Sequence, residues 1–182
     1  MTTLLCLSGS LRAASSSRAV LEKLCGAIGD EVSILRFDIA TLPFYNADLG
    51  SPEPVEAFKA AIADADGLVI VTPEYNYSVP GVLKNAIDWA SRPAYASVFK
   101  DKPVLVMSTS GGALGGVRAQ AHLKYILNGM LARVFPWQEI VVTHANQKVK
   151  DGIFEDETVE AFMSDAVRSF LEWVEATSPA KA

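Results

Sequence analysis

Two uninterrupted apolar runs, residues 68–71 and 104–107, constrain the fold of this 182-residue chain more than any other feature. Such runs are typical of β-strands that are covered on both faces, as in a parallel sheet. Successive side chains of a strand point to opposite faces, so both faces need helices packed against them. We therefore expect an α/β protein with these two runs as its central strands.

Strand and helix patterns alternate along most of the chain. Strands are predicted at residues 3–8, 32–37, 67–72, 103–109 and 139–143, and helices at residues 17–28, 54–63, 80–90, 116–131 and 156–176. Right-handed crossovers among five parallel strands give a doubly wound sheet with helices on both faces, and the flavodoxin-like strand order 2-1-3-4-5 is the commonest at this size. No repeat or linker divides the chain, so we expect a single domain over residues 1–182 with a frayed tail from residue 177.

Charge and composition exclude several classes of protein. The formal net charge is −5 without a lysine or arginine cluster, so neither nucleic acid nor an anionic membrane is an expected partner. No apolar stretch approaches the roughly 18 residues of a membrane span, and the N-terminus lacks the pattern of an export signal. The two cysteines, Cys6 and Cys25, fit reduced buried thiols in a cytoplasmic protein better than a disulfide framework or a metal site.

The segment between the first strand and the first helix combines an arginine with several hydroxyls. It reads Ser8-Gly9-Ser10-Leu11-Arg12-Ala13-Ala14-Ser15-Ser16-Ser17. A strand that leads into a helix start directs unpaired backbone N–H groups at one point, where the helix dipole favours negative charge. Arg12 would add a permanently charged donor fork suited to phosphate oxygens. The segment predicts a phosphate cradle, and the alternative is a polar turn with a solvated arginine.

Two more loops should converge on the same edge of the sheet. Residues 73–81 place Tyr75, Asn76 and Tyr77 between prolines, which suits a flat ring that needs apolar faces and hydrogen-bonding groups at its edge. Residues 108–116 contain four glycines, which allow the backbone to approach a ligand closely. A structural turn and a flexible connection are the respective alternatives.

A phosphate cradle beside a ring-binding loop indicates a phosphorylated heterocycle, and FMN fits best. The first loop has one glycine where the dinucleotide fingerprint G-x-G-x-x-G has three. A tightly held NAD is therefore disfavoured.

Two motifs in these loops resemble the NAD(P)H-dependent FMN reductase family. They are Gly9-Ser10-Leu11-Arg12-x-x-Ser15 and Pro73-Glu74-Tyr75-Asn76-Tyr77-Ser78-Val79-Pro80-Gly81-Val82-Leu83-Lys84-Asn85-Ala86-Ile87-Asp88-Trp89, and the resemblance covers essentially the whole chain, including Thr109-Ser110-Gly111-Gly112. The family includes quinone reductases, azoreductases and chromate-reducing enzymes. The resemblance implies FMN bound at the interfaces of a homodimer or homotetramer. It also implies hydride transfer from NADPH or NADH to the flavin, followed by two-electron reduction of quinone, azo, flavin or metal-oxyanion acceptors.

The same resemblance implies roles for individual residues. The first loop would hold the FMN phosphate, residues 74–77 would line the isoalloxazine, and the glycine-rich loop would close its other edge. The candidate cofactor-binding residues are Ser10, Arg12, Ser15, Ser16, Ser17, Pro73, Glu74, Tyr75, Asn76, Tyr77, Ser110, Gly111 and Gly112. Many relatives carry asparagine in place of Ser17. No catalytic side chain and no metal ligand is expected, because the cofactor carries the electron transfer.

Other residues near the expected site are assigned less directly. Arg118 is a candidate for the extra phosphate of NADPH or for a subunit contact. The polar segment 45–52 is a candidate for approaching the ring from a neighbouring subunit. His122 and His144 are expected to be structural or surface residues.

Two alternative functions have sequence support. Cys6 and Arg12 satisfy the C-x5-R spacing of cysteine-dependent phosphatases, but Cys6 lies in an apolar run, where burial raises a thiol pKa. In addition, Ala13 replaces the usual hydroxyl residue, and no Asp-Pro pair supplies an acid loop. A flavodoxin-like electron carrier would hold FMN without nicotinamide turnover, although such carriers tend to be more acidic than this chain.

Overall fold

Parallel β-strands form the centre of the molecule, which the computed structural model describes over residues 1–29 and 31–177. The strands lie in the order β2 (Ser33–Arg36), β1 (Thr3–Ser8), β3 (Gly67–Pro73) and β4 (Pro103–Thr109). Two short strands, β5 (Arg133–Val134) and β6 (Ile140–Val142), share the fifth position and pair with opposite ends of β4. The predicted α/β class and strand order 2-1-3-4-5 are therefore confirmed. Of the tail predicted to fray, residues 178–182 lie outside the described residues.

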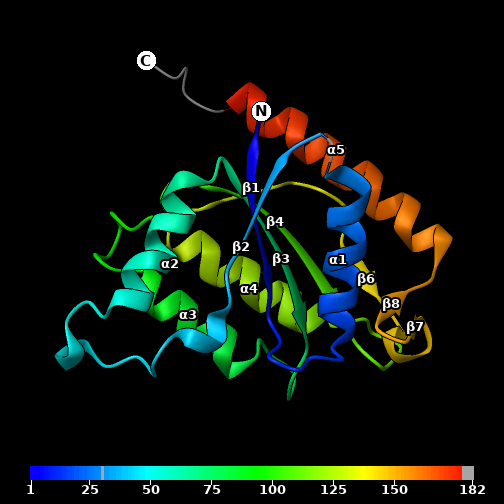
Figure 1. Cartoon of the computed structure of the whole chain (residues 1–182), viewed down its shortest axis with the longest axis horizontal. Coiled ribbons are helices and arrows are strands. Elements are labelled where there is room, and N and C mark those ends of the chain that lie inside the picture. The colour runs from blue at the N-terminus through cyan, green and yellow to red at the C-terminus, as the bar shows by residue number, and fades with distance from the viewer. Residues whose placement is uncertain (30, 178–182) are drawn as a thin grey trace.

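Helices cover both faces of the sheet (Figure 1). One face carries α1 (Ser16–Ile28) and α5 (Glu157–Thr177), and the other carries α2 (Glu53–Asp64), α3 (Gly81–Ala90) and α4 (Val117–Gly129). Each predicted helix is present, and its ends differ from the prediction by at most two residues. The hydrophobic pattern thus located every helix of the doubly wound arrangement.

Short elements were not predicted from the sequence. The expected strand 139–143 corresponds to β6, whereas β5 is a separate piece ahead of Pro136, which has no N–H to donate to a ladder. An antiparallel pair, β7 (Val149–Lys150) and β8 (Ile153–Phe154), and three 3-10 helices, η1 (Ile39–Thr41), η2 (Ala47–Leu49) and η3 (Ala145–Gln147), complete the described elements. Segments of two or three residues are too short to show a periodic pattern.

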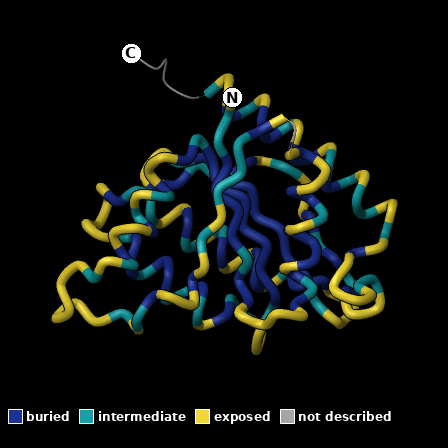
Figure 2. The backbone as a smooth tube through the Cα atoms, in the orientation of Figure 1, coloured by how far each residue is buried: buried dark blue, intermediate teal, exposed yellow. Residues whose placement is uncertain are grey.

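The core lies in two layers, one on each side of the sheet. Strands β3 and β4 are buried along their whole length (Figure 2). Alternate side chains of β3 face the two layers, Val69 toward α1 and α5 and Ile70 toward α2, α3 and α4. On the first side, Phe170 of α5 packs so closely that a Cβ at Gly67 would lie 3.0 Å from its ring. The two apolar runs are therefore covered on both faces, as predicted.

Parallel pairing brings the ends of three strands to one edge of the molecule. Ser8 pairs with Val71, and Pro73 pairs with Thr109, so β1, β3 and β4 finish at similar heights. The loops that follow these strands leave at the lower edge in Figure 1. This edge is where the candidate site lies.

Replacing Phe170 with alanine should lower the free energy of unfolding by about 3–5 kcal/mol, because the phenyl ring is fully buried between α5 and the sheet. Urea denaturation followed by circular dichroism measures this difference. Phe44→Ala is the matched control, since Phe44 is 88% exposed and the change should stay within about 0.5 kcal/mol. Equal losses in the two variants would contradict this account of the core.

Candidate functional site

The first loop places a connected set of hydroxyls at the start of α1. Ser15 Oγ lies 2.7 Å from Ser17 Oγ, which lies 3.4 Å from Ser8 Oγ. Ser15 is the N-cap residue of α1, yet its side chain makes no capping hydrogen bond to the helix. Backbone N–H groups of the first helical turn lack partners within the helix. Hydroxyls and free N–H groups therefore gather at the positive end of the helix dipole, as an anion site requires.

Arg12 stands at the exposed crest of the same loop. Its backbone N–H donates to Ser10 Oγ at 3.3 Å, and its carbonyl accepts from the backbone of Ser15 at 3.2 Å. Its side chain forms no ion pair with any residue that the structure describes. The loop backbone is thus held in a tight turn while the guanidinium is available to a ligand.

Close approach of the first loop to β3 depends on Gly9. Its N–H donates to the carbonyl of Val71 at 2.8 Å, and a Cβ at this position would lie only 2.8 Å from Thr72 Oγ1. The next residue, Ser10, is buried and its Oγ lies 3.3 Å from the hydroxyl of Tyr75. The glycine therefore lets the cradle sit directly beside the loop that follows β3.

That second loop forms a tight hairpin. Tyr75 and Ser78 exchange two backbone hydrogen bonds of 3.0 and 3.1 Å, with Asn76 at φ 48° and Tyr77 at φ 67° between them. Positive φ at both central residues is the type I′ turn, which is unusual for a residue as bulky as tyrosine. Tyr75 and Tyr77 are 44% and 66% exposed. The hairpin accepts backbone strain and presents two aromatic rings at the edge of the sheet.

The side chain of Glu74 is directed at α4 and closes the N-terminus of that helix. Its Oε2 accepts from the backbone N–H groups of Arg118 at 3.0 Å and Ala119 at 3.2 Å, and its Oε1 accepts from the Arg118 guanidinium at 3.3 Å. The N-cap residue of α4, Gly116, has no side chain to do this. A carboxylate at this position satisfies orphan donors and complements the helix dipole. A ligand would meet Glu74 through its main chain.

Two further contacts fasten the hairpin to α4. The guanidinium of Arg118 lies over the ring of Tyr77, 4.6 Å from its centroid. Ser78 Oγ lies 2.9 Å from Nδ1 of His122, one turn further along the helix. Neither Arg118 nor His122 was predicted to hold this loop, because their partners lie more than forty residues away in sequence.

The glycine-rich loop is pinned to the segment that follows β6. Ser110 donates its N–H to the carbonyl of Val142 at 3.0 Å and accepts from the N–H of Ala145 at 2.9 Å. A Cβ at Gly111 would lie 2.7 Å from Nδ2 of Asn146, and Gly112 accepts from the N–H of His144 at 3.0 Å. This network does not fit the alternative of a flexible connection.

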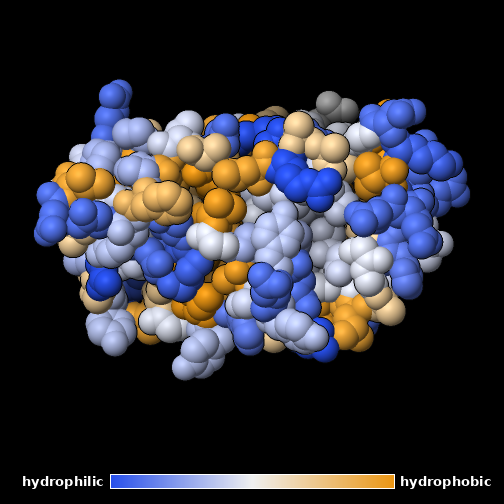
Figure 3. Space-filling model, turned by 90° about the horizontal axis from the view of Figure 1, so that it is seen from below, coloured by the Kyte–Doolittle hydropathy of each residue, from blue (hydrophilic) through white to orange (hydrophobic). Residues whose placement is uncertain are grey.

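Direct contacts join the three loops at the carboxyl edge. Ser10 meets Tyr75, and Ser16 Oγ lies 3.5 Å from Thr109 Oγ1 at the end of β4. Figure 3 shows this edge in space-filling form, with apolar side chains interspersed among hydrophilic ones. The three loops therefore form one cluster at this edge. Thr72 and Thr109 are buried directly behind the loops, and Asn146 is exposed beside them. Nothing in the local sequence pattern marks Thr72 or Asn146.

Segment 45–52 is fixed at its start and exposed beyond it. The backbone N–H of Tyr45 donates to Asn85 Oδ1 at 2.7 Å, and Trp89 Nε1 donates to the carbonyl of Pro43 at 2.8 Å, so α3 holds this end. Residues 46–51 are exposed.

In residues 1–29 and 31–177, no group of three or more His, Cys, Asp or Glu side chains is placed to hold a metal ion. None of the helices in these ranges combines the length and the apolar character needed to cross a membrane.

Cys6 does not meet the requirements of a phosphatase nucleophile. A hydrogen bond with Cys25, together with burial, raises its pKa far above the usual thiol range. Its side chain belongs to the core layer beneath α1. The C-x5-R spacing is therefore present without a thiolate beside Arg12.

Comparison with known proteins identifies the family of this chain. Residues 2–147 match the family model described as NADPH-dependent FMN reductase. The chain belongs to this family. The resemblance noted in the sequence is thereby confirmed, and so is the assignment of the chain as an enzyme that uses FMN with NAD(P)H as reductant.

Members of this family and related structures align with most of the chain. It is 39% identical over 169 residues to a 2-hydroxy-1,4-benzoquinone reductase of a Burkholderia species, covering 91% of this chain and 92% of the relative. It is 50% identical over 128 residues to a quinone reductase of Escherichia coli K12, covering 66% of each. The solved structure of FerB, a flavoenzyme NAD(P)H:(acceptor) oxidoreductase from Paracoccus denitrificans, superposes with a TM-score of 0.87 at 34% identity, covering 97% of this chain and 99% of FerB.

Replacing Glu74 with glutamine should lower the free energy of unfolding by about 1–2 kcal/mol, because the start of α4 loses a charged acceptor. Chemical denaturation measures the change. Glu139→Gln is the matched control, since Glu139 only forms a half-exposed ion pair with Lys124 of α4, with 3.7 Å between the charged atoms. That variant should change stability by less than about 0.5 kcal/mol. If both variants lose the same amount, Glu74 does not act as the cap of α4.

Proposed function

We propose that this chain binds FMN at the carboxyl edge of its sheet and uses it to reduce quinones with NADPH or NADH. The observation that carries the proposal is the contact among three loops, one with an anion site and one with exposed aromatic rings, in a chain of the FMN reductase family. When bound, FMN supplies the two-electron chemistry, accepting a hydride from the nicotinamide and passing electrons to an acceptor. The protein's residues bind and orient the reactants.

In this proposal the first loop holds the phosphate. Ser10, Ser15, Ser16 and Ser17 would offer hydroxyls, the first turn of α1 would offer backbone N–H groups, and Arg12 would add a charged fork. The fit is supported by the buried hydroxyls at a helix start that make no cap hydrogen bond, and by the free guanidinium of Arg12. Phosphate oxygens would satisfy these donors.

The loops at residues 73–81 and 108–116 would hold the isoalloxazine ring of FMN. Tyr75, Asn76 and Tyr77 provide exposed aromatic faces and an amide, and the main chain of Pro73 and Glu74 lies at the end of β3. Ser110, Gly111 and Gly112 offer backbone groups without bulky side chains, since Gly111 and Gly112 are exposed and packed against residues 144–146. A flat heterocycle edge needs such unobstructed donors and acceptors.

Quinones are the acceptors that we place first. The relatives with the alignments described above are named as a benzoquinone reductase and a quinone reductase. A quinone is flat and apolar with two carbonyl oxygens, which suits the exposed rings of Tyr75 and Tyr77. Azo compounds, free flavins and metal oxyanions are further acceptors that an open flavin face would admit.

We further propose a homodimer or homotetramer of a single FMN-binding domain, residues 1–182, working in the cytoplasm. Large apolar side chains on the surface support an assembly, among them Tyr125 at 81% and Tyr95 at 71% exposure. The exposed segment 46–51 would be free to reach a neighbouring subunit. The free thiols of Cys6 and Cys25 fit a reducing compartment.

Visible absorption of the purified protein tests the function directly. After FMN is added and the excess removed, flavin absorption should remain with the protein, bleach when NADPH or NADH is added without oxygen, and return on addition of a benzoquinone. Retained absorption that neither nucleotide bleaches would favour the flavodoxin-like electron carrier. Loss of the flavin on desalting would contradict the proposed site.

Replacing Arg12 with alanine should weaken FMN binding by about 1.5–3 kcal/mol, or about ten- to a hundredfold in Kd, because a charge-assisted phosphate contact is lost. Quenching of flavin fluorescence measures the affinity. Arg18→Ala is the matched control, since Arg18 is an exposed arginine in the first turn of α1 and lies outside the proposed cradle. Equal effects of the two substitutions would mean that net charge, and not the cradle, determines FMN affinity.

A further inference from the structure

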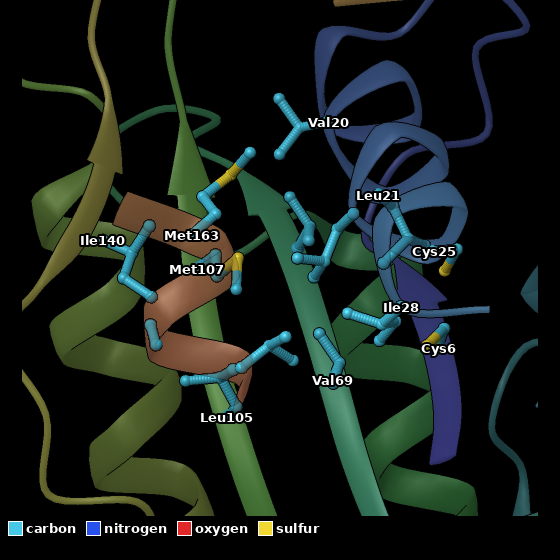
Figure 4. Close-up of a cluster of buried hydrophobic side chains, with 14 of the residues drawn as sticks. Cys6, Val20, Leu21, Cys25, Ile28, Val69, Leu105, Met107, Ile140 and Met163 are labelled. Carbon is cyan, nitrogen blue, oxygen red and sulfur yellow. The ribbon is translucent and has the colours of Figure 1, made fainter. Parts of the chain in front are cut away.

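A cavity at the edge of the sheet has Cys6, one of two cysteines that the proposed reaction does not use, on its wall, while Cys25 is buried behind that wall. The cavity, of about 280 Å³, lies between the end of β1, α1 and the end of β2, with Cys6, Glu22 and Arg36 on its wall. It is large enough to admit a molecule of the size of hydrogen peroxide. Figure 4 shows Cys6 of β1 and Cys25 of α1 close to each other at the margin of the buried cluster.

Cys25 has the surroundings of a reactive thiol. Arg36 Nη1 donates to Cys25 Sγ at 3.1 Å, and Arg36 Nη2 donates to Glu22 Oε2 at 2.6 Å. The thiol of Cys6 lies close to that of Cys25 (Figure 4). A cation that donates to a sulfur stabilises the thiolate, which is the nucleophilic form.

The surroundings of the two sulfurs shift their pKa values in opposite directions. The hydrogen bond from Cys6 and that from Arg36 lower the pKa of Cys25 to about 7, against the opposing effects of burial and Glu22. The same pairing raises the pKa of Cys6. Near neutral pH the pair therefore consists of a Cys25 with substantial thiolate character and a protonated Cys6 beside it.

We propose that Cys25 is a site of oxidation by hydroperoxides, with Cys6 as the resolving thiol. The proposal rests on the hydrogen bond from Arg36 to Cys25, on the nearness of Cys6 to Cys25, and on a cavity whose wall includes Cys6 and Arg36. The two thiols and Arg36 are not residues of the proposed FMN site, so the oxidation can be tested separately from the reductase activity, although Ser10 of the phosphate cradle also lines the cavity.

The chemistry proceeds in two steps. The Cys25 thiolate attacks one oxygen of hydrogen peroxide, forming an S–O bond while the O–O bond breaks and hydroxide leaves, so the sulfur is oxidised to a sulfenic acid. The Cys6 thiol then attacks that sulfur, forming the S–S bond and releasing water with the proton of Cys6. Two electrons pass in total from the two thiols to the peroxide. The product links β1 to α1.

Peptide mapping after peroxide treatment tests this site in the FMN-loaded protein. Hydrogen peroxide should produce a peptide pair linked through Cys6 and Cys25 that thiol reductants separate. In Cys6→Ser, and independently in Cys6→Ala, Cys25 should gain oxygen without forming the link. Recovery of both thiols unmodified in the wild-type protein would overturn the proposal, as would oxidation of Cys6 in Cys25→Ser at the wild-type rate.

Arg36 variants test the reason for the reactivity. Arg36→Met should slow oxidation of Cys25 at pH 7 severalfold, because the thiolate fraction falls when the cation is removed, and should move the midpoint of the rate against pH upward. Arg36→Lys, which keeps the positive charge, should restore part of the rate. Arg18→Met is the matched control, since Arg18 lines the same cavity, and its rate should match the wild type. An unchanged rate in Arg36→Met would contradict the role of Arg36.

Discussion

Parallel pairing of β1, β3 and β4 is the constraint on which the rest of this molecule depends. The register aligns their carboxyl ends, so three loops far apart in the sequence leave the sheet at one edge. The pairing is stable only because both faces of β3 and β4 are covered by helices, which removes their apolar side chains from water. The helices that cover the sheet also bring their N-termini to the loop edge. One arrangement thus supplies the core, the loops and the anion-binding dipoles.

The loops are held by contacts that cross between elements. Glu74 ties the hairpin after β3 to α4, Gly9 lets the first loop approach Thr72, and Asn146 packs on Gly111. These contacts offset the strain of two non-glycine residues with positive φ, which costs about 1–3 kcal/mol for each residue. Backbone groups and aromatic rings at the edge are therefore fixed before any ligand binds, which lowers the entropy cost of binding.

The chain contains the cysteine and the arginine of a phosphatase motif, and the tertiary structure assigns them to different places. Arg12 lies at the exposed crest of the first loop, whereas Cys6 lies in the core and pairs with Cys25. The C-x5-R spacing does not say which face of the sheet the cysteine side chain occupies. Here Cys6 faces the core layer of α1, so its thiol does not act together with Arg12. The thiol of Cys25, which no motif marked, has the cationic neighbour that activates a sulfur.

The sequence by itself determined the class of the fold, the strand order, the positions of the helices and the family. Periodic hydrophobicity and clusters of glycine or hydroxyl residues are local patterns that can be recognised in the linear sequence. Runs 68–71 and 104–107 and the first loop are examples. Only the tertiary structure decided that Glu74 caps α4, that Arg118 lies over Tyr77 and that Arg36 contacts Cys25. These pairs join residues on different elements, and their contacts depend on distances and side-chain directions that are fixed only when the sheet and helices pack. The short strand β5 escaped prediction because its pairing, and not its own pattern, makes it a strand.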